Sequence, residues 1–175
     1  LRRKIVFLLL LIITFSCADN DEPIVNTETN TLEFFQELDI SYGNDSDQVF
    51  DLYLPANRTA NTKVMILIHG GGWTSGDKVE MNDLKNFILQ NIPDIAVANM
   101  NYRLADNTTQ AYPMQINDIT SVVNYLKTKQ NEYVISNELG FTGVSAGAHL
   151  SMLWSYAFAK QCLYSCGQML LFLSY

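Results

Sequence analysis

The sequence predicts an α/β fold built on a mostly parallel sheet, because buried strands and amphipathic helices alternate along the chain. Three short apolar runs have the composition of strands that are covered on both faces. They are Lys63–Ile68, Asp94–Asn101 and Leu139–Thr142. A stretch with apolar residues at helical spacing follows each run. These stretches are Val79–Asn91, Pro113–Lys129 and Ala148–Ala159.

An antiparallel hairpin is expected before this alternation begins. Phe34–Ser41 and Gln48–Leu54 each alternate between apolar and polar residues, which is typical of strands. Tyr42–Asp47 between them contains the Gly, Asn and Asp residues that favour turns. Pro55 ends the second strand, and Pro113 is expected at the first turn of its helix, where its missing N–H costs nothing.

The composition limits the class of protein and of partner. A chain of 175 residues with 48% hydrophobic and 17% charged residues is long enough to bury one core. Its formal net charge of −7 argues against a nucleic acid partner. Neither a metal nor another cofactor is expected, because the candidate ligands Cys162 and Cys166 have no His or acidic neighbours.

Residues 1–17 have the pattern of an export signal. Arg2, Arg3 and Lys4 precede the apolar block Ile5–Ile13, which at about 14 Å of helix is too short for a bilayer of about 30 Å. The small residue before Cys17 resembles a bacterial lipoprotein signal, in which the cysteine is lipidated.

We therefore expect an exported lipoprotein, anchored in the membrane through Cys17 and facing the periplasm or the cell surface. Ordinary secretion is the alternative. Residues 18–33 are polar and without periodicity, which predicts a flexible tether.

The first motif that indicates a catalytic site is Gly143-Val144-Ser145-Ala146-Gly147, which lies between a predicted strand and a predicted helix. A serine at such a turn projects its hydroxyl above the sheet edge, as in a nucleophile elbow. Side chains at Gly143 and Gly147 would collide where strand and helix pass each other. The alternative is an ordinary Gly-flanked loop that caps a helix.

A second motif, His69-Gly70-Gly71-Gly72-Trp73, follows the buried strand Lys63–Ile68. Consecutive glycines let the backbone approach a ligand and turn its N–H groups toward it. Such donors stabilise the negative charge of a tetrahedral intermediate. A flexible glycine linker is the alternative, although six apolar residues seldom precede one.

Four segments together resemble the N-terminal portion of an α/β-hydrolase of the carboxylesterase group, the HGGG-type esterases related to hormone-sensitive lipase. They are Leu52–Pro55, His69–Trp73, Asn101–Ala105 and Gly143–Gly147. The resemblance implies that Ser145 is the nucleophile and that the N–H groups of Gly71, Gly72 and Ala146 form an oxyanion hole. It also implies that His69 braces the loop and that His149 is a packing residue. The substrate would be a small-molecule or carbohydrate-linked ester.

The catalytic acid and base are not found where the resemblance requires them. A serine nucleophile needs a histidine oriented by a carboxylate. Residues 146–175 contain no Asp or Glu and only His149, which lies about one turn into the helix. We therefore expect residues 34–159 to be the N-terminal part of a hydrolase domain, truncated after the elbow helix and inactive as given.

Other readings stay open. Residues 160–175 form an atypical tail, which is either a further strand or the end of a truncated or frame-shifted product. The chain could also be a non-catalytic exported lipoprotein or a non-functional fragment. A peptidase of the prolyl-oligopeptidase kind is a weaker third option.

Overall fold

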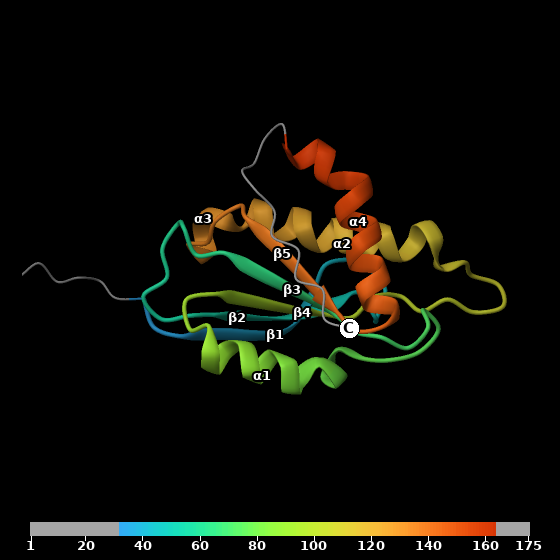
Figure 1. Ribbon diagram of the computed structural model, residues 1–175, viewed down its shortest axis with the longest axis horizontal. Coiled ribbons are helices and arrows are strands. Elements are labelled where there is room, and N and C mark those ends of the chain that lie inside the picture. The colour runs from blue at the N-terminus through green and yellow to red at the C-terminus, as the bar shows by residue number, and fades with distance from the viewer. Residues whose placement is uncertain (1–31, 164–175) are drawn as a thin grey trace, which may run out of the picture. The chain divides into compact units, whose positions relative to one another are not determined.

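The computed structural model describes residues 32–163, with side chains described as far as residue 157 (Figure 1). The predicted signal peptide, Cys17 and nearly all of the predicted tether lie outside the described residues. So do residues 164–175 of the predicted tail.

The described part of the chain folds around one five-stranded sheet. Its strands are β1 (Phe35–Ser41), β2 (Val49–Leu54), β3 (Val64–Ile68), β4 (Ala96–Met100) and β5 (Leu139–Gly143). Their order across the sheet is β1-β2-β4-β3-β5. β3 pairs in parallel with both β4 and β5, whereas β2 pairs antiparallel with β1 and β4. Four strands thus run in one direction and only β2 opposes them, which confirms the predicted fold class.

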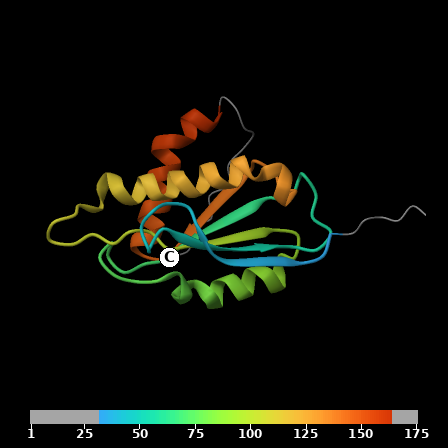
Figure 2. The same cartoon turned by 180° about the vertical axis from the view of Figure 1, so that it is seen from behind.

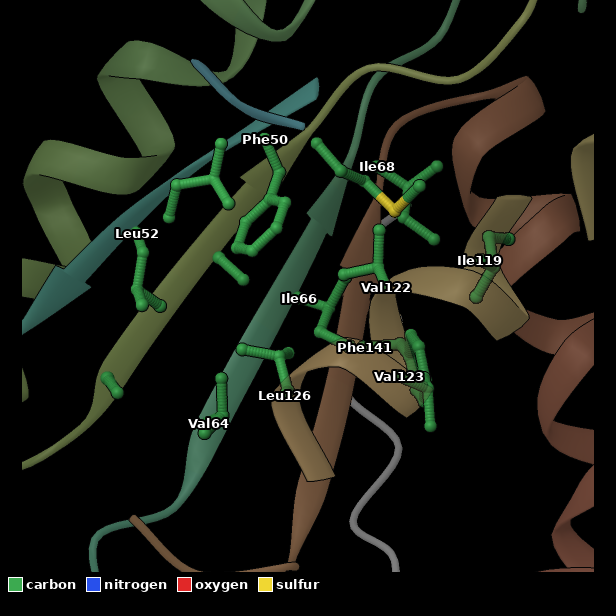
Figure 3. Close-up of a cluster of buried hydrophobic side chains, with 14 of the residues drawn as sticks. Phe50, Leu52, Val64, Ile66, Ile68, Ile119, Val122, Val123, Leu126 and Phe141 are labelled. Carbon is green, nitrogen blue, oxygen red and sulfur yellow. The ribbon is translucent and has the colours of Figure 1, made fainter. Parts of the chain in front are cut away.

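Helices cover both faces of this sheet (Figures 1 and 2). α1 (Asn82–Asn91) lies on one face, and α2 (Ala111–Thr128), α3 (Gln130–Tyr133) and α4 (Ala146–Leu163) lie on the other. The larger core packs β-strand residues such as Ile66 and Phe141 against Ile119 and Val122 of α2 (Figure 3). A smaller core joins Met65 and other residues of the opposite face to Ile88 of α1.

β3 is the central element, because it contributes to both cores. All five of its residues are buried. Val64, Ile66 and Ile68 belong to the larger core, whereas Met65 and Leu67 belong to the smaller one. This alternation follows from the two-residue period of a strand. The continuous apolar run in the sequence is therefore the signature of a strand buried from both sides.

The helix following β3 differs from the prediction, which placed a single helix over Val79–Asn91. A 3-10 turn, η1 (Lys78–Met81), comes first and α1 starts at Asn82. The Asp77 side chain caps this turn by accepting a hydrogen bond of 2.8 Å from the amide of Val79. In 3-10 geometry residues i and i+3 share a face, so Lys78 and Met81 are both buried against the sheet.

The later helices also differ from their predicted bounds. The backbone of Tyr112 is non-helical, so the regular part of α2 begins at Pro113, as predicted. The short α3 was not predicted. α4 starts two residues before Ala148 and continues to Leu163, because no Gly or Pro interrupts the sequence between Ala148 and Leu163. Among the described residues, no helix is both long and apolar enough to span a membrane.

Candidate active site

Ser145 occupies the sharp turn between β5 and α4. Its φ is 52°, in the left-handed region that non-glycine residues rarely adopt. The amide of Val144 donates to the carbonyl of Ile68 at 3.3 Å, and the amide of Gly147 donates to the carbonyl of Val144 at 2.9 Å. Ser145 itself is exposed. Backbone hydrogen bonds therefore hold Ser145 at the surface in a strained conformation.

Glycine is required on both sides of Ser145, as the sequence analysis anticipated. A β-carbon on Gly143 would lie 2.6 Å from the carbonyl oxygen of Gly147, which is closer than packed atoms come. A β-carbon on Gly147 would clash with the carbonyl oxygens of Ile68 and His69 at the end of β3. Strand, elbow and helix therefore contact one another backbone to backbone.

The triple-glycine turn lies directly beside the elbow. A β-carbon on Gly70 would be 3.5 Å from the β-carbon of Ser145 and 3.0 Å from the carbonyl oxygen of Val144. Gly71, Gly72 and Trp73 then follow with φ values of 99°, 62° and 69°. Three successive left-handed residues reverse the chain above the end of β3. Glycine at the first two positions removes the steric cost of this conformation.

Amide groups at this place are free to bind a ligand. Within residues 32–163, Gly71, Gly72 and Ala146 donate no hydrogen bond to the carbonyls of turns, loops and caps. Ala146 is also the first residue of α4, whose N-terminus carries partial positive charge. The three donors named from the resemblance therefore have no hydrogen-bond partner in the described part of the chain, and they lie on the two loops that meet at Ser145.

His69 supports the turn from below. Its ring is fully buried and stacks on Tyr102, with ring centroids 4.2 Å apart and an angle of 8° between the planes. Nδ1 donates to the carbonyl of Gly70 at 2.8 Å, so the neutral ring carries its proton there. Nε2 has no hydrogen-bond partner among the described residues. Burial lowers the pKa of His69, which favours the neutral form.

Tyr102 completes this support. Its hydroxyl donates to the carbonyls of His69 and Gly70, both at 3.0 Å. Burial raises the pKa of Tyr102 to about 12, so the hydroxyl keeps its proton at neutral pH. Tyr102 lies just beyond β4, the strand next to β3. The carbonyls at the base of the turn are thereby fixed by a neighbouring strand.

Trp73 is held at the far end of the turn. Its carbonyl accepts a hydrogen bond of 2.7 Å from the Gln115 side chain and one of 2.8 Å from the amide of Ala105. Gln115 also donates to the carbonyl of Arg103 at 2.9 Å. One carboxamide on α2 thus ties the glycine turn to the segment that follows β4.

The remaining candidate residues do not form a proton relay with Ser145. His149 is exposed, and its ring packs edge-on against Trp73 with centroids 5.3 Å apart. Asp118 is fully buried, where it pairs with Arg103 at 2.6 Å and accepts a hydrogen bond from Gln48. Arg103 and Asp118 thus join the segment after β4 to α2. Residues 32–163 contain no group of three or more side chains suited to holding a metal.

The family of the chain can now be stated. The family model described as BD-FAE matches residues 50–169, which is more than half of the chain. The chain belongs to the BD-FAE family. The match includes both the glycine turn and the elbow, and it confirms the predicted resemblance to esterases of the α/β-hydrolase fold.

Solved structures support the same assignment. Carboxyl esterase 2 of the mycorrhizal fungus Tuber melanosporum has the same fold, with a TM-score of 0.62 at 21% identity over 85% of this chain and 47% of that one. An inhibited esterase B from Lactobacillus rhamnosis gives 0.58 at 27% identity, over 81% of this chain and 47% of that one. A bifunctional GH43-CE protein of Bacteroides eggerthii gives 0.55 at 27% identity, over 67% and 17% respectively.

The BD-FAE chain spans less than half the length of each of these solved proteins. The comparison with curated proteins gave no match.

Two supporting residues were missed by the sequence analysis. Gln115 stands four residues before Ile119, in register with the apolar stripe of α2. A polar residue at such a position is a signal of a buried hydrogen bond. Tyr102 directly follows a buried strand. Nothing in its immediate sequence reveals that its hydroxyl binds carbonyls more than thirty residues away.

Proposed function

We propose that this BD-FAE chain carries the nucleophile and oxyanion hole of a serine carboxylesterase. The oxygen of Ser145 would attack the carbonyl carbon of an ester, while its proton passes to a base. The negative charge would form on the former carbonyl oxygen, beside the amides of Gly71, Gly72 and Ala146. The alcohol would then leave, and water would hydrolyse the acyl-enzyme.

One observation carries this proposal. A strained, exposed serine lies against a turn of three left-handed residues, and the amides predicted to receive the oxyanion are unpaired. Donors fixed by the backbone need no reorganisation when charge develops, which is the property that makes an oxyanion hole effective. Esterase B and a carbohydrate esterase from gut microbiota, which share this fold, are consistent with acyl-ester substrates, either small molecules or carbohydrate esters.

These 175 residues do not supply an evident catalytic base for Ser145. After Ser145 the 175 residues offer His149 alone and no carboxylate, and His149 packs on Trp73. We therefore propose that these 175 residues alone are inactive or nearly so. A non-catalytic exported lipoprotein, or a non-functional fragment, is the second candidate, and the same gap in the triad favours it.

Labelling with a fluorophosphonate separates the two candidates. These probes react with an activated serine and leave a bond that mass spectrometry locates on one peptide. We expect slow labelling confined to Ser145 and abolished in Ser145→Ala. Exposed Ser46, in the turn between β1 and β2, is the matched control, because Ser46→Ala should label like the unchanged chain. Labelling that persists in Ser145→Ala would refute the assignment of the nucleophile.

Export remains a proposal with its own test. We propose that Cys17 is lipidated and that the acidic segment after it tethers the domain. Expression in bacteria fed with an alkyne fatty acid should label the protein, and Cys17→Ser should lose the label. A labelled Cys17→Ser protein would contradict the anchor, whereas unlabelled protein in the medium would indicate secretion.

A further inference from the structure

The three proposed oxyanion donors share one arrangement of their peptide groups. In a trans peptide the C=O and the N–H point to opposite sides, and among the described residues only the Tyr112–Pro113 bond is cis. A hydrogen bond to the carbonyl of one residue therefore fixes the direction of the next residue's amide. A group that holds this carbonyl from behind also polarises the peptide, which makes its N–H a stronger donor.

Two of the three peptides are held in this way by a side chain and by a helix. The Gly70 carbonyl, whose peptide carries the Gly71 amide, accepts a hydrogen bond of 3.0 Å from the Tyr102 hydroxyl. The Ser145 carbonyl, whose peptide carries the Ala146 amide, accepts a hydrogen bond of 3.1 Å from an amide in the first turn of α4.

The third peptide, between Gly71 and Gly72, is held by Ser75. The Gly71 carbonyl accepts a hydrogen bond of 2.9 Å from the Ser75 hydroxyl and one of 3.1 Å from the Ser75 amide. The amide of Thr74 donates to the same oxygen at 3.2 Å. Three donors thus converge on one carbonyl, and the hydroxyl forms the shortest of the three bonds.

Ser75 is fixed in place by its neighbours, although the residue is exposed. A β-carbon on Gly71 would overlap the carbonyl oxygen of Ser75, so the two backbones touch. A β-carbon on Gly76, whose φ is 102°, would lie 2.6 Å from Nδ1 of His69 and 2.7 Å from the carbonyl oxygen of Gly70. The segment that carries the Ser75 hydroxyl is therefore packed against the back of the glycine turn.

We propose that Ser75 is a positioning residue of the oxyanion hole. Its hydroxyl orients and polarises the peptide between Gly71 and Gly72, and so directs the Gly72 amide toward the oxyanion. The inference rests on the proposed function for its catalytic meaning. The hydrogen bond, however, does not depend on any reaction of Ser145, so the two can fail separately.

NMR of the full 175-residue chain tests the hydrogen bond without any reaction. In Ser75→Ala the peptide loses polarisation, so we expect the carbonyl carbon resonance of Gly71 and the amide nitrogen resonance of Gly72 to move upfield together. Ser75→Thr keeps a hydroxyl at this position and should restore both. An unmoved Gly71 carbonyl, or shifts spread evenly from Gly70 to Trp73, would overturn the proposal.

The rate of fluorophosphonate labelling at Ser145 tests the catalytic meaning. Oxyanion donors act on charge that develops in the transition state, so Ser75→Ala should lower the limiting rate constant. The probe concentration that gives half of the maximal rate should stay the same. One net hydrogen bond corresponds to labelling that is about two- to tenfold slower. Ser75→Thr should label at close to the rate of the unchanged chain.

Ser46→Ala is the matched control, because Ser46 is also an exposed serine in a turn. It should change neither the resonances of the glycine turn nor the labelling rate. Equal labelling rates in Ser75→Ala and the unchanged chain would overturn the proposal and leave the proposed function standing. Absence of labelling in every protein, with the Gly71 and Gly72 resonances displaced as expected, would count against the proposed function alone.

Discussion

At the scale of single residues, the candidate site is fixed by the backbone more than by side chains. Gly147 packs onto the carbonyls that end β3, and Gly70 packs against Ser145. Gly72 differs from them, because a β-carbon there would meet no atom within 4 Å. The two kinds of glycine answer different needs: close approach at Gly147, and a left-handed turn at Gly72.

Replacing Gly147 by alanine should therefore cost more stability than replacing Gly72. We expect about 1–3 kcal/mol or more for Gly147→Ala, because backbone must move to admit the methyl group. Gly72→Ala should cost about 1–2 kcal/mol, the penalty for a left-handed alanine. Urea unfolding followed by circular dichroism measures both. Equal losses in the two variants would show that close packing at Gly147 has no special role.

His69 should make the stability of the domain depend on pH. Because burial lowers its pKa, the unfolded chain binds the proton more readily than the folded one. The stabilisation is therefore complete above about pH 6.5, the ordinary pKa of histidine, and decreases as the pH falls below that value. In His69→Gln the loss of stability between pH 8 and pH 5.5 should be smaller.

Exposed His149 provides the control for this measurement. His149→Gln makes the same change of residue type at an exposed position, so a comparison of the two variants isolates the effect of burial at His69. Urea midpoints at the two pH values suffice. An unchanged slope in His69→Gln would assign the pH dependence to the carboxylates instead.

At the scale of elements, ion pairs around the buried Lys78 join the N-terminal hairpin to η1. Lys78 is buried and pairs with Asp51 of β2 at 2.5 Å and with Asp39 of β1 at 2.8 Å. Burial lowers the pKa of Lys78, but the hydrogen bonds that its ammonium donates to Asp39 and Asp51 outweigh this effect and raise the pKa overall. The stabilisation is thus complete below the ordinary lysine pKa of about 10.4 and is lost only above it. Asp39 lies at an irregularity in the β1–β2 register with φ of 53°.

Removing Lys78 alone should lower stability more than removing Lys78 and Asp51 together. Lys78→Met leaves the buried carboxylate of Asp51 without its cation, which we expect to lower the free energy of unfolding by about 3–5 kcal/mol. The double variant Lys78→Met with Asp51→Leu should recover part of that loss. Thermal and urea unfolding of the three proteins would measure it. A double variant as unstable as the sum of its single changes would contradict the account.

The elements themselves were largely predictable, and the reasons are local. The run Lys63–Ile68 could hardly be other than a doubly buried strand, and the paired alternation of β1 and β2 predicts their hairpin. The split between η1 and α1 was not predictable, because it depends on Lys78 reaching carboxylates on two strands. The sequence identified the glycines of the candidate site. It could not show the supports, Tyr102 and Gln115, whose partners are distant along the chain.

At the scale of the whole molecule, the chain spans less than half the length of the solved esterases to which it is similar. The chain covers 47% of esterase B and 47% of the fungal carboxyl esterase. The proposed nucleophile and oxyanion hole lie within it, whereas residues 146–175 contain no carboxylate. An oxyanion hole and binding site without a complete triad retain only about 10³–10⁴-fold acceleration over water.

We therefore expect the 175-residue chain to hydrolyse p-nitrophenyl acetate at or below that residual level. Release of p-nitrophenol, followed by its absorbance, is the measurement, with Ser145→Ala as the background. Ser46→Ala, at an exposed serine of the β1–β2 turn, should behave like the unchanged chain. Turnover at about 1 s⁻¹ or faster that depends on Ser145 would be an ordinary enzymatic rate and would contradict the expectation.

The seating of Gly147 on the carbonyls of Ile68 and His69 has a consequence for evolution. Both loops of the candidate site are anchored to the end of one strand, whereas a neighbouring apolar pocket is lined mainly by residues of α2 and α4. Substitutions on those helices can therefore reshape the pocket while the spacing between the elbow and the glycine turn stays constant. Selection can thus act on the pocket and on the two anchored loops independently.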